Sequence, residues 1–460
     1  MRSDTIAAVA TGMGHSGIGI IRISGKDALS IASAIFRPAD KKLHLSDVKS
    51  HTIHYGFLFD GNALVDEVMV SVMKEPRSYT AEDTVEINCH GNSLIMNRVL
   101  ELVIRQGARL AEPGEFTKRA FLNGRINLSE AEAVMDVISA ESERSLTNSL
   151  RQLKGSLSEK IIDLRGSILY EIAYIESVLD DPEHYSFDHH SSELSEKIDF
   201  LTGSINTLIS SFEKGKLLKE GINTVIIGKP NVGKSSLLNI LVGEDKAIVT
   251  DVAGTTRDVL EQCISLNGIS LNIIDTAGIR FTEDIVEKIG VEKAKKTARD
   301  ADLIVYVADS SVELNENDFE ILKLIEDKRV IVLLNKTDLE SRVEENDLRS
   351  RMKEDTVIIK TSTRKHTGID EFEKEIERMF FDGKICNQDE VMITNLRHRE
   401  CLAEALESLE QVKKSIDKGM PEDFYSIDLM SAYSSLGSIL GVEVEDDLIN
   451  KIFSEFCMGK

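Results

Sequence analysis

Gly228-Lys229-Pro230-Asn231-Val232-Gly233-Lys234-Ser235 is a glycine-rich segment that separates two apolar runs. The first run, Val225 to Ile227, has the length of a strand, and the second, Ser236 to Leu241, is typical of a helix. Strand, glycine loop and helix in this order are what a phosphate-binding loop requires. Glycines let backbone N–H groups point at phosphate oxygens, and the helix start adds the positive end of its dipole. The segment therefore predicts a nucleotide site.

The side chains of this loop have specific expected roles. Lys234 reaches the β and γ phosphates, and the Ser235 hydroxyl binds Mg²⁺. A glycine turn in an ordinary βαβ unit is the alternative interpretation. The motifs further along the chain favour the nucleotide site.

Residues 221–380 have the pattern of a P-loop G domain. Their apolar runs alternate with helical stretches, which predicts a mainly parallel sheet covered by helices. The runs are Val225 to Ile227, Leu271 to Ile274, Leu303 to Val307, Val330 to Leu334 and Val357 to Ile359.

Helical periodicity flanks this α/β region on both sides, in residues 121–220 and 381–460. We expect one long helix whose apolar stripe runs from Leu146 to Leu179, and a second helix with a stripe from Leu194 to Phe212. Two later stripes run from Leu402 to Ile416 and from Val444 to Phe456. Such stripes indicate the core of a helical bundle. The simplest architecture inserts the G domain into a helical domain built from both flanks.

Residues 1–120 read as a small α+β domain. We expect strands at Gly19 to Ile23, Thr52 to Phe59, Glu67 to Met73 and Thr84 to Asn88, and helices at Asp27 to Phe36 and Ser93 to Gln106.

The composition bounds the function. The chain has 460 residues, of which 42% are hydrophobic, so two to four folded domains are expected. No apolar run is long enough for a membrane span or forms a signal segment, which predicts a cytoplasmic protein without a membrane. Its five cysteines have no metal-ligand spacing. The net charge of −24 argues against unaided binding to a polyanion.

Asn335-Lys336-Thr337-Asp338 follows an apolar strand and predicts which base is bound. A carboxylate at Asp338 accepts hydrogen bonds from N1–H and the 2-amino group of guanine, whereas adenine offers neither donor in that arrangement. A site built on such bonds rejects the analogue that lacks them by roughly 10⁴-fold. We therefore predict GTP as the nucleotide.

Two segments resemble the switch regions of a GTPase. Asp275-Thr276-Ala277-Gly278 ends an apolar strand, which brings Asp275 near the metal and the Gly278 N–H near the γ phosphate. Gly254-Thr255-Thr256-Arg257-Asp258 offers Thr256 as a second metal ligand.

The residue after the Asp-x-x-Gly motif is Ile279, where Ras-like proteins have a glutamine that orients water. Asn231 and the backbone of 250–255 suit a monovalent cation in place of an arginine finger. Arg257 or Arg280 as a built-in finger is the competing hypothesis. Glu283, Asp284 and Glu287 are the acids that we consider for positioning water.

The motif set identifies a resemblance that covers essentially the whole chain. Gly228–Ser235, Thr250–Asp258, Asp275–Arg280 and Asn335–Asp338 lie between helical flanks, and the chain ends in Cys457-Met458-Gly459-Lys460. Gly17–Gly25 and Pro113–Gly124 add further specific pieces. Together they resemble the MnmE (TrmE) family of tRNA-modification GTPases.

The resemblance implies a potassium-dependent GTPase that forms a homodimer through its N-terminal domain. It implies Mg²⁺ ligands at Ser235 and Thr256, K⁺ ligands at Asn231, Thr250, Val252 and Thr255, and a water-positioning Glu287. The nucleotide-contacting residues would be Asn231, Val232, Gly233, Lys234, Ser235, Ser236, Thr250, Thr255, Thr256, Asp275, Thr276, Ala277, Gly278, Asn335, Lys336, Asp338, Ser362 and Thr363. Ser362-Thr363-Arg364 departs from the family's usual Ser-Ala-Lys, although its backbone can still recognise the base.

The same resemblance implies a tetrahydrofolate one-carbon donor held by Arg22, Glu86, Arg125 and Lys460. With an MnmG (GidA)-type flavoprotein that carries FAD, such proteins install a carboxymethylaminomethyl-type group on C5 of the wobble uridine of certain tRNAs. Cys457 is either a thiolate nucleophile or a packed terminal cysteine. The alternative function is a regulatory GTPase of ribosome or RNA assembly without modification chemistry.

Overall fold

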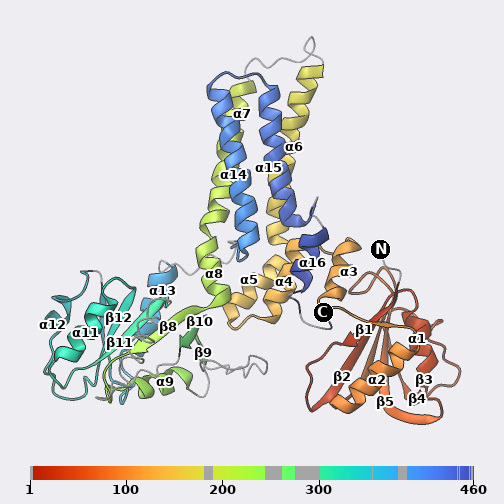
Figure 1. The fold of residues 1–460 in the computed structure, drawn as a ribbon, viewed down its shortest axis with the longest axis horizontal. Helices are drawn as coiled ribbons and strands as arrows, with labels where there is room; N and C mark the ends of the chain where they lie inside the picture. The colour runs from red at the N-terminus through yellow and green to blue at the C-terminus, as the bar shows by residue number, and fades with distance from the viewer. Residues whose placement is uncertain are drawn as a thin grey trace. The chain divides into compact units, whose positions relative to one another are not determined.

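The structure is a computed structural model of the chain. It describes residues 4–180, 190–243, 262–274, 301–354, 356–381, 391–442, 444, 446–454, 456 and 459. An N-terminal α+β region, long helices and an α/β P-loop region follow the predicted fold class (Figure 1). The chain forms two compact units, the first made of residues 1–135, 158–172 and 430–460, and the second of 136–157 and 173–429. Because these units cut across the long helices, the division at residues 120, 220 and 380 stays a prediction.

The first unit contains a seven-stranded sheet in the order β3-β4-β5-β6-β2-β1-β7. Its bounds are β1 (Ile6–Val9), β2 (Ser16–Ser24), β3 (Phe36–Pro38), β4 (Thr52–Asp60), β5 (Ala63–Met73), β6 (Thr84–Gly91) and β7 (Arg109–Leu110). All pairs are antiparallel except β1 with β7. Helices α1 (Ala28–Ile35) and α2 (Ser93–Arg105) pack their apolar stripes on one face (Figure 1). The predicted strands and helices of this region are confirmed.

Helices α3, α4 and α16, from two parts of the chain, also contribute to the first unit. Leu128 of α4 packs with Ile449 and Phe453 of α16 in a small separate core. The bounds are α3 (Glu115–Leu122), α4 (Leu128–Ile138) and α16 (Asp446–Ser454). The apolar stripe predicted near the chain's end is therefore a packing face, as expected.

The second unit contains a six-stranded sheet in the order β13-β12-β11-β8-β10-β9, which is parallel except for β9. Its bounds are β8 (Ile222–Ile227), β9 (Gln262–Leu266), β10 (Ile269–Ile274), β11 (Leu303–Asp309), β12 (Val330–Asn335) and β13 (Val357–Lys360). The described helices around it are α9 (Lys234–Val242), α11 (Glu316–Ile325), α12 (Glu345–Arg349) and α13 (Ile369–Phe381). All five predicted strands are confirmed.

The long helices correct one prediction. The stripe from Leu146 to Leu179 belongs to two helices, α5 (Glu143–Leu153) and α6 (Ser156–Asp180), and not to one. Gly155 separates them with a φ of 92°, a left-handed conformation that ends the helix at little cost for glycine. Leu146 is 37% exposed, so the first part of the stripe does not belong to the bundle core.

The other long helices follow the predicted pattern more closely. Helices α7 (His190–Ser210) and α14 (Leu396–Asp417) lie side by side (Figure 1). Leu194, Ile198 and Leu402 are fully buried. The remaining helices are α8 (Phe212–Glu220) and α15 (Asp423–Leu440), of which α15 was not predicted. Within the part of the chain that the structure describes, no helix combines the length and apolar character that a membrane span needs.

Candidate nucleotide-binding site

The glycine loop after β8 has the backbone that its sequence requires. Asn231 and Gly233 have φ values of 65° and 107°. A Cβ atom on Gly233 would lie 2.2 Å from the Asn335 side-chain nitrogen, and one on Gly228 would lie 2.3 Å from the Val307 carbonyl oxygen. Both glycines are therefore needed for close approach as well as for backbone freedom. The loop therefore packs closely against Val307 of β11 and Asn335 at the end of β12.

Lys234 opens α9 and points back along the loop. Its Nζ donates to the carbonyl oxygens of Gly228 and Lys229, both at 2.7 Å. Burial lowers the pKa of the Lys234 ammonium. Ser235 and Ser236 are exposed on the first turn of α9, where the N–H groups of a helix start are free to bind an anion.

Asn335 connects the glycine loop to the rest of the site. It ends β12 and is fully buried. Its Nδ2 donates to the Val232 carbonyl at 2.8 Å, and its Oδ1 accepts from the Thr363 N–H at 3.0 Å. The structure thus brings together three predicted segments that lie far apart in the sequence.

Asp338 lies beside this junction with one oxygen engaged. Ser362 Oγ donates to Asp338 Oδ1 at 2.6 Å. This hydrogen bond holds the pKa of Asp338 below its usual value. Lys336, with a φ of 64°, places its Nζ 2.6 Å from Asp309. Burial alone would raise the pKa of Asp309, but the bonds from Lys336 and Ser311 outweigh it and lower that pKa.

Comparisons with known proteins cover the whole chain. The model of the MnmE helical domain matches residues 128–457, and that of the GTP-binding protein TrmE N-terminus matches residues 5–125. The chain is 54% identical to the tRNA modification GTPase MnmE of Lachnoclostridium phytofermentans, with 100% of both chains covered. It is 47% identical to that of Acetivibrio thermocellus, again over 100% of both, and 46% identical to that of Enterococcus faecalis, over 100% of this chain and 99% of the relative. The chain belongs to the MnmE family of tRNA modification GTPases.

Sixteen residues that were considered from the sequence itself or from the resemblance lie outside the described residues. They are Thr250, Val252, Thr255, Thr256, Arg257, Asp275, Thr276, Ala277, Gly278, Ile279, Arg280, Glu283, Asp284, Glu287, Cys457 and Lys460. Their roles stay predictions. In the residues that the structure does describe, no group of three His, Cys, Asp or Glu side chains is arranged to hold a metal ion.

A second group of predicted residues meets on the N-terminal sheet of this MnmE-family chain. Arg22 on β2 donates to Glu86 on β6 at 2.8 Å. Arg22 and Arg125 both lie over the Tyr79 ring, at 5.2 and 4.8 Å from its centroid. Arg125 also donates to the Tyr79 carbonyl at 2.9 Å. Tyr79 was missed in the sequence because no local pattern distinguishes it.

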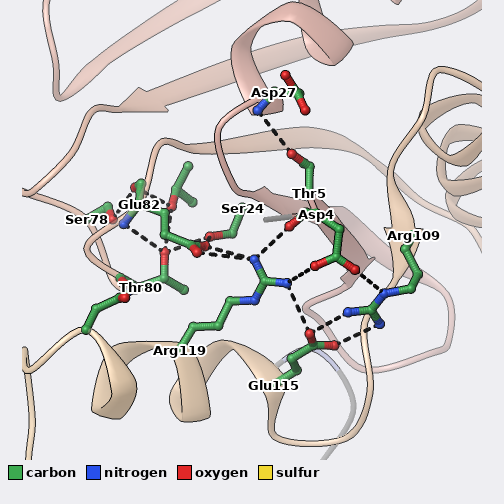
Figure 2. A network of polar contacts seen from close by, with 12 residues as sticks. Asp4, Thr5, Ser24, Asp27, Ser78, Thr80, Glu82, Arg109, Glu115 and Arg119 are labelled. Carbon is green, nitrogen blue, oxygen red and sulfur yellow. Dashed lines mark hydrogen bonds and ion pairs between the residues drawn. The ribbon is translucent and has the colours of Figure 1, made fainter. Parts of the chain in front are cut away.

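An ion-pair network joins Arg119 of α3 to three carboxylates of the same unit (Figure 2). The Arg119 guanidinium, 9% exposed, contacts the carboxylates of Asp4, Glu82 and Glu115 at 3.1–3.2 Å. Arg109 bonds Asp4 and Glu115 at 2.7 and 2.6 Å. Hydrogen bonds from Arg109 hold the pKa of Asp4 below its usual value. Burial raises the pKa of Glu115, but Arg109 and Arg119 outweigh it and lower that pKa.

The glycine loop also has a partner that sequence reasoning missed. Lys229 Nζ lies 2.6 Å from Asp318 Oδ2, and Asp318 is 1% exposed. The available signal was the spacing of Asn315 and Asp318, which is typical of a helix N-terminus. That spacing explains a helix cap but gives no reason to expect a lysine from the loop.

Proposed function

We propose that this chain is a GTP-hydrolysing enzyme of tRNA modification. The observation that carries the proposal is the Asp338 carboxylate, which Ser362 orients beside a glycine loop tied to Asn335. One Asp338 oxygen is already engaged, so the other side of the carboxylate is available for the two donors of guanine. The family's full-length likeness supports tRNA as the molecule that is modified.

The phosphates lie along the loop and the first turn of α9. Lys234 exchanges its carbonyl partners for phosphate oxygens, which costs little because its ammonium stays paired throughout. The exposed N–H groups at the start of α9 complete the cradle. Lys336 flanks the base while its ammonium remains on Asp309.

Two metal ions fit residues of this site. The exposed Ser235 hydroxyl on the first turn of α9 suits Mg²⁺, with Thr256 as its companion. The exposed side chain of Asn231, on a loop residue with φ of 65°, suits K⁺, with Thr250, Val252 and Thr255 as further ligands. Bound cations neutralise charge that develops on the phosphates. Glu287 positions the attacking water.

The N-terminal domain binds a tetrahydrofolate one-carbon derivative. Arg22, Arg125 and Tyr79 support this assignment, since two cations and an aromatic face suit a ligand with carboxylates and a flat ring. Lys460 joins them, and Cys457 is the candidate nucleophile. The modification takes place at C5 of the wobble uridine, together with a flavoprotein of the MnmG (GidA) type that carries FAD.

A homodimer is part of the proposal. The face of the N-terminal sheet opposite α1 and α2 exposes Ile53, Tyr55 and Met69 at 65%, 49% and 47%. Tyr55 and Met69 are direct cross-strand neighbours, and Arg22 and Glu86 follow on the next strands of the same sheet. An exposed apolar patch of this kind is typical of a protein interface.

GTP hydrolysis in KCl and in NaCl at equal ionic strength tests the proposed mechanism. We expect K⁺ to activate hydrolysis strongly. In the Asn231→Ala variant we expect the rate in KCl to be about 10²–10³-fold lower, because a group that stabilises charge in the transition state is lost. Asn346→Ala, which alters an exposed asparagine on α12, is the matched control.

Two outcomes distinguish the potassium mechanism from GTP hydrolysis itself. Equal rates in both salts would overturn the potassium mechanism and leave Arg257 or Arg280 as the charge-neutralising group. No hydrolysis in either salt, with or without the flavoprotein, would contradict the proposed function itself.

A further inference from the structure

The ion pair between Lys229 and Asp318 joins the glycine loop to a helix that contributes no predicted nucleotide contact. Lys229 is the second residue of the loop, and its side chain is 18% exposed. Asp318 lies in the first turn of α11 and is 1% exposed. Removing a carboxylate from water is costly unless it is paired, so this lysine is the charge that balances Asp318.

Three elements hold the Asp318 carboxylate in place. Tyr306, fully buried on β11, donates its hydroxyl to Oδ1 at 2.9 Å. The N–H of Asn315, which precedes α11, donates to Oδ2 at 2.9 Å. Lys229 is therefore anchored to a group whose position is fixed by both a strand and a helix start.

The backbone of Lys229 faces the nucleotide side of the loop. Its carbonyl accepts the bond from Lys234 Nζ at 2.7 Å. Lys229 thus supplies one of the two carbonyl oxygens that hold the Lys234 ammonium before phosphate oxygens replace them. The neighbouring residue, Gly228, is held against the Val307 carbonyl, and Val232 is tied to Asn335. Lys229 supplies the anchor between these two points.

We propose that Asp318 is a positioning residue for nucleotide binding, which acts through Lys229 to hold the glycine loop in its phosphate-binding conformation. A loop that is already ordered loses less conformational entropy on binding, so the anchor raises affinity. The inference rests on the proposed function, because it takes this loop as the site of GTP and GDP.

The test measures affinity for GDP and GTP by titration with fluorescent nucleotide analogues in the full-length protein. Lys229→Met keeps the aliphatic stem and removes the charge. We expect it to weaken GDP and GTP binding equally, by about tenfold, with kcat less affected than KM, since the anchor supports binding in general. Lys229→Arg, which can still pair with Asp318, is expected to restore most of the affinity.

A double-mutant cycle separates positioning from plain stability. If Asp318 acts through Lys229, the Lys229→Met/Asp318→Asn protein binds nucleotide no more weakly than Lys229→Met alone. Leu322→Ala, which removes a buried side chain from the same helix, is the control for a weakened α11. It is expected to lower the unfolding temperature and leave nucleotide affinity unchanged.

The inference and the proposed function fail on different results. Unchanged affinity in Lys229→Met, additive losses in the double variant, or a loss in Leu322→Ala as large as in Lys229→Met would overturn the inference. Failure of the unaltered protein to bind guanine nucleotides would instead contradict the proposed function. If Asp318→Asn does not fold, Lys229→Met and Lys229→Arg decide the matter, since the Lys229 side chain is only partly buried.

Discussion

One carboxylate oxygen of Asp338 is held by a hydrogen bond, and this contact bears on the proposed recognition of guanine. Ser362 donates to Oδ1, which fixes the rotation of the carboxylate. The hydrogen bond also keeps the pKa of Asp338 low, so the group is ionised at neutral pH. An ionised carboxylate accepts hydrogen bonds only, which matches the two donors on guanine.

Exchanging Asp338 for asparagine tests this account. Asp338→Asn replaces one acceptor with an amide donor, so GTP loses a bond while xanthosine triphosphate, with a carbonyl at C2, gains one. We expect GTP affinity to fall by about 10²–10⁴-fold and xanthosine triphosphate to bind better than GTP. Competition titrations measure both. Glu340→Gln, an exposed neighbour, is the control. Unchanged GTP preference would show that Asp338 does not read the base.

Sequence reasoning predicted the local conformation of the glycine loop, although the roles of its residues stay predictions. Gly228, Gly233 and Lys234 act through a loop of a few residues, so their spacing alone predicted their conformation. Lys229 and Asp318 are in contact, but β9, β10 and β11 separate them along the sequence. No periodicity or spacing in the sequence predicts such a distant pair. The packing of Tyr79 against Arg22 was hidden for the same reason.

Among the elements, helix α3 is held by ion pairs as well as by the buried Phe116. Its Arg119 contacts three carboxylates, from Asp4, Glu82 and Glu115 (Figure 2). The folded-state pKa values of Asp4 and Glu115 lie below their usual values. For groups with lowered pKa, the stabilisation is fully present above their unfolded pKa of about 4 and is lost as the pH falls through their folded-state values. The N-terminal sheet should therefore weaken in acid.

We predict that Arg119→Met destabilises the protein and flattens this acid dependence. Removing the guanidinium takes one of two arginine partners from Asp4 and Glu115, which costs about 1–3 kcal/mol at neutral pH. Without Arg119 the carboxylate pKa values rise toward normal, so less stability remains to be lost below about pH 4. Calorimetric unfolding at stepwise lower pH measures both effects. Arg105→Met removes a more exposed arginine and serves as the control. An acid slope that Arg119→Met leaves unchanged would contradict the account.

Strands were predicted correctly where both of their faces are buried, because such strands have a continuous apolar sequence. β11 and β12 are examples, and their apolar residues are buried. It failed at Gly155, because the apolar spacing continues across the break between α5 and α6. Many helices tolerate a glycine in their interior. The sequence therefore did not predict that Gly155 adopts a φ of 92° and ends the helix. Strand β9 was also missed, since its sequence Gln-Cys-Ile-Ser-Leu contains no continuous apolar run.

For the whole chain, the connections around the G domain matter most. The chain enters β8 from α8 and returns through residues 391–395. Gln152 donates to the Met392 carbonyl at 2.8 Å, and Thr394 donates to Asp136 at 3.1 Å. The Ile393 N–H donates to Ser211 Oγ at 3.2 Å. Helical elements that precede the six-stranded sheet in the sequence therefore hold the segment that follows it.

The open face of the N-terminal sheet gives the last prediction. It exposes Ile53, Tyr55 and Met69 on the strands next to the Arg22 and Glu86 pair. Burying these side chains against a second copy contributes about 25 cal/mol of association free energy per Å² of apolar area. We expect Ile53→Lys/Met69→Lys to convert a dimer into a monomer, because unpaired lysines resist burial. Light scattering after size-exclusion chromatography measures the mass. Leu448→Lys, an exposed position on α16, is the control. A dimer that survives the double substitution would place the interface elsewhere.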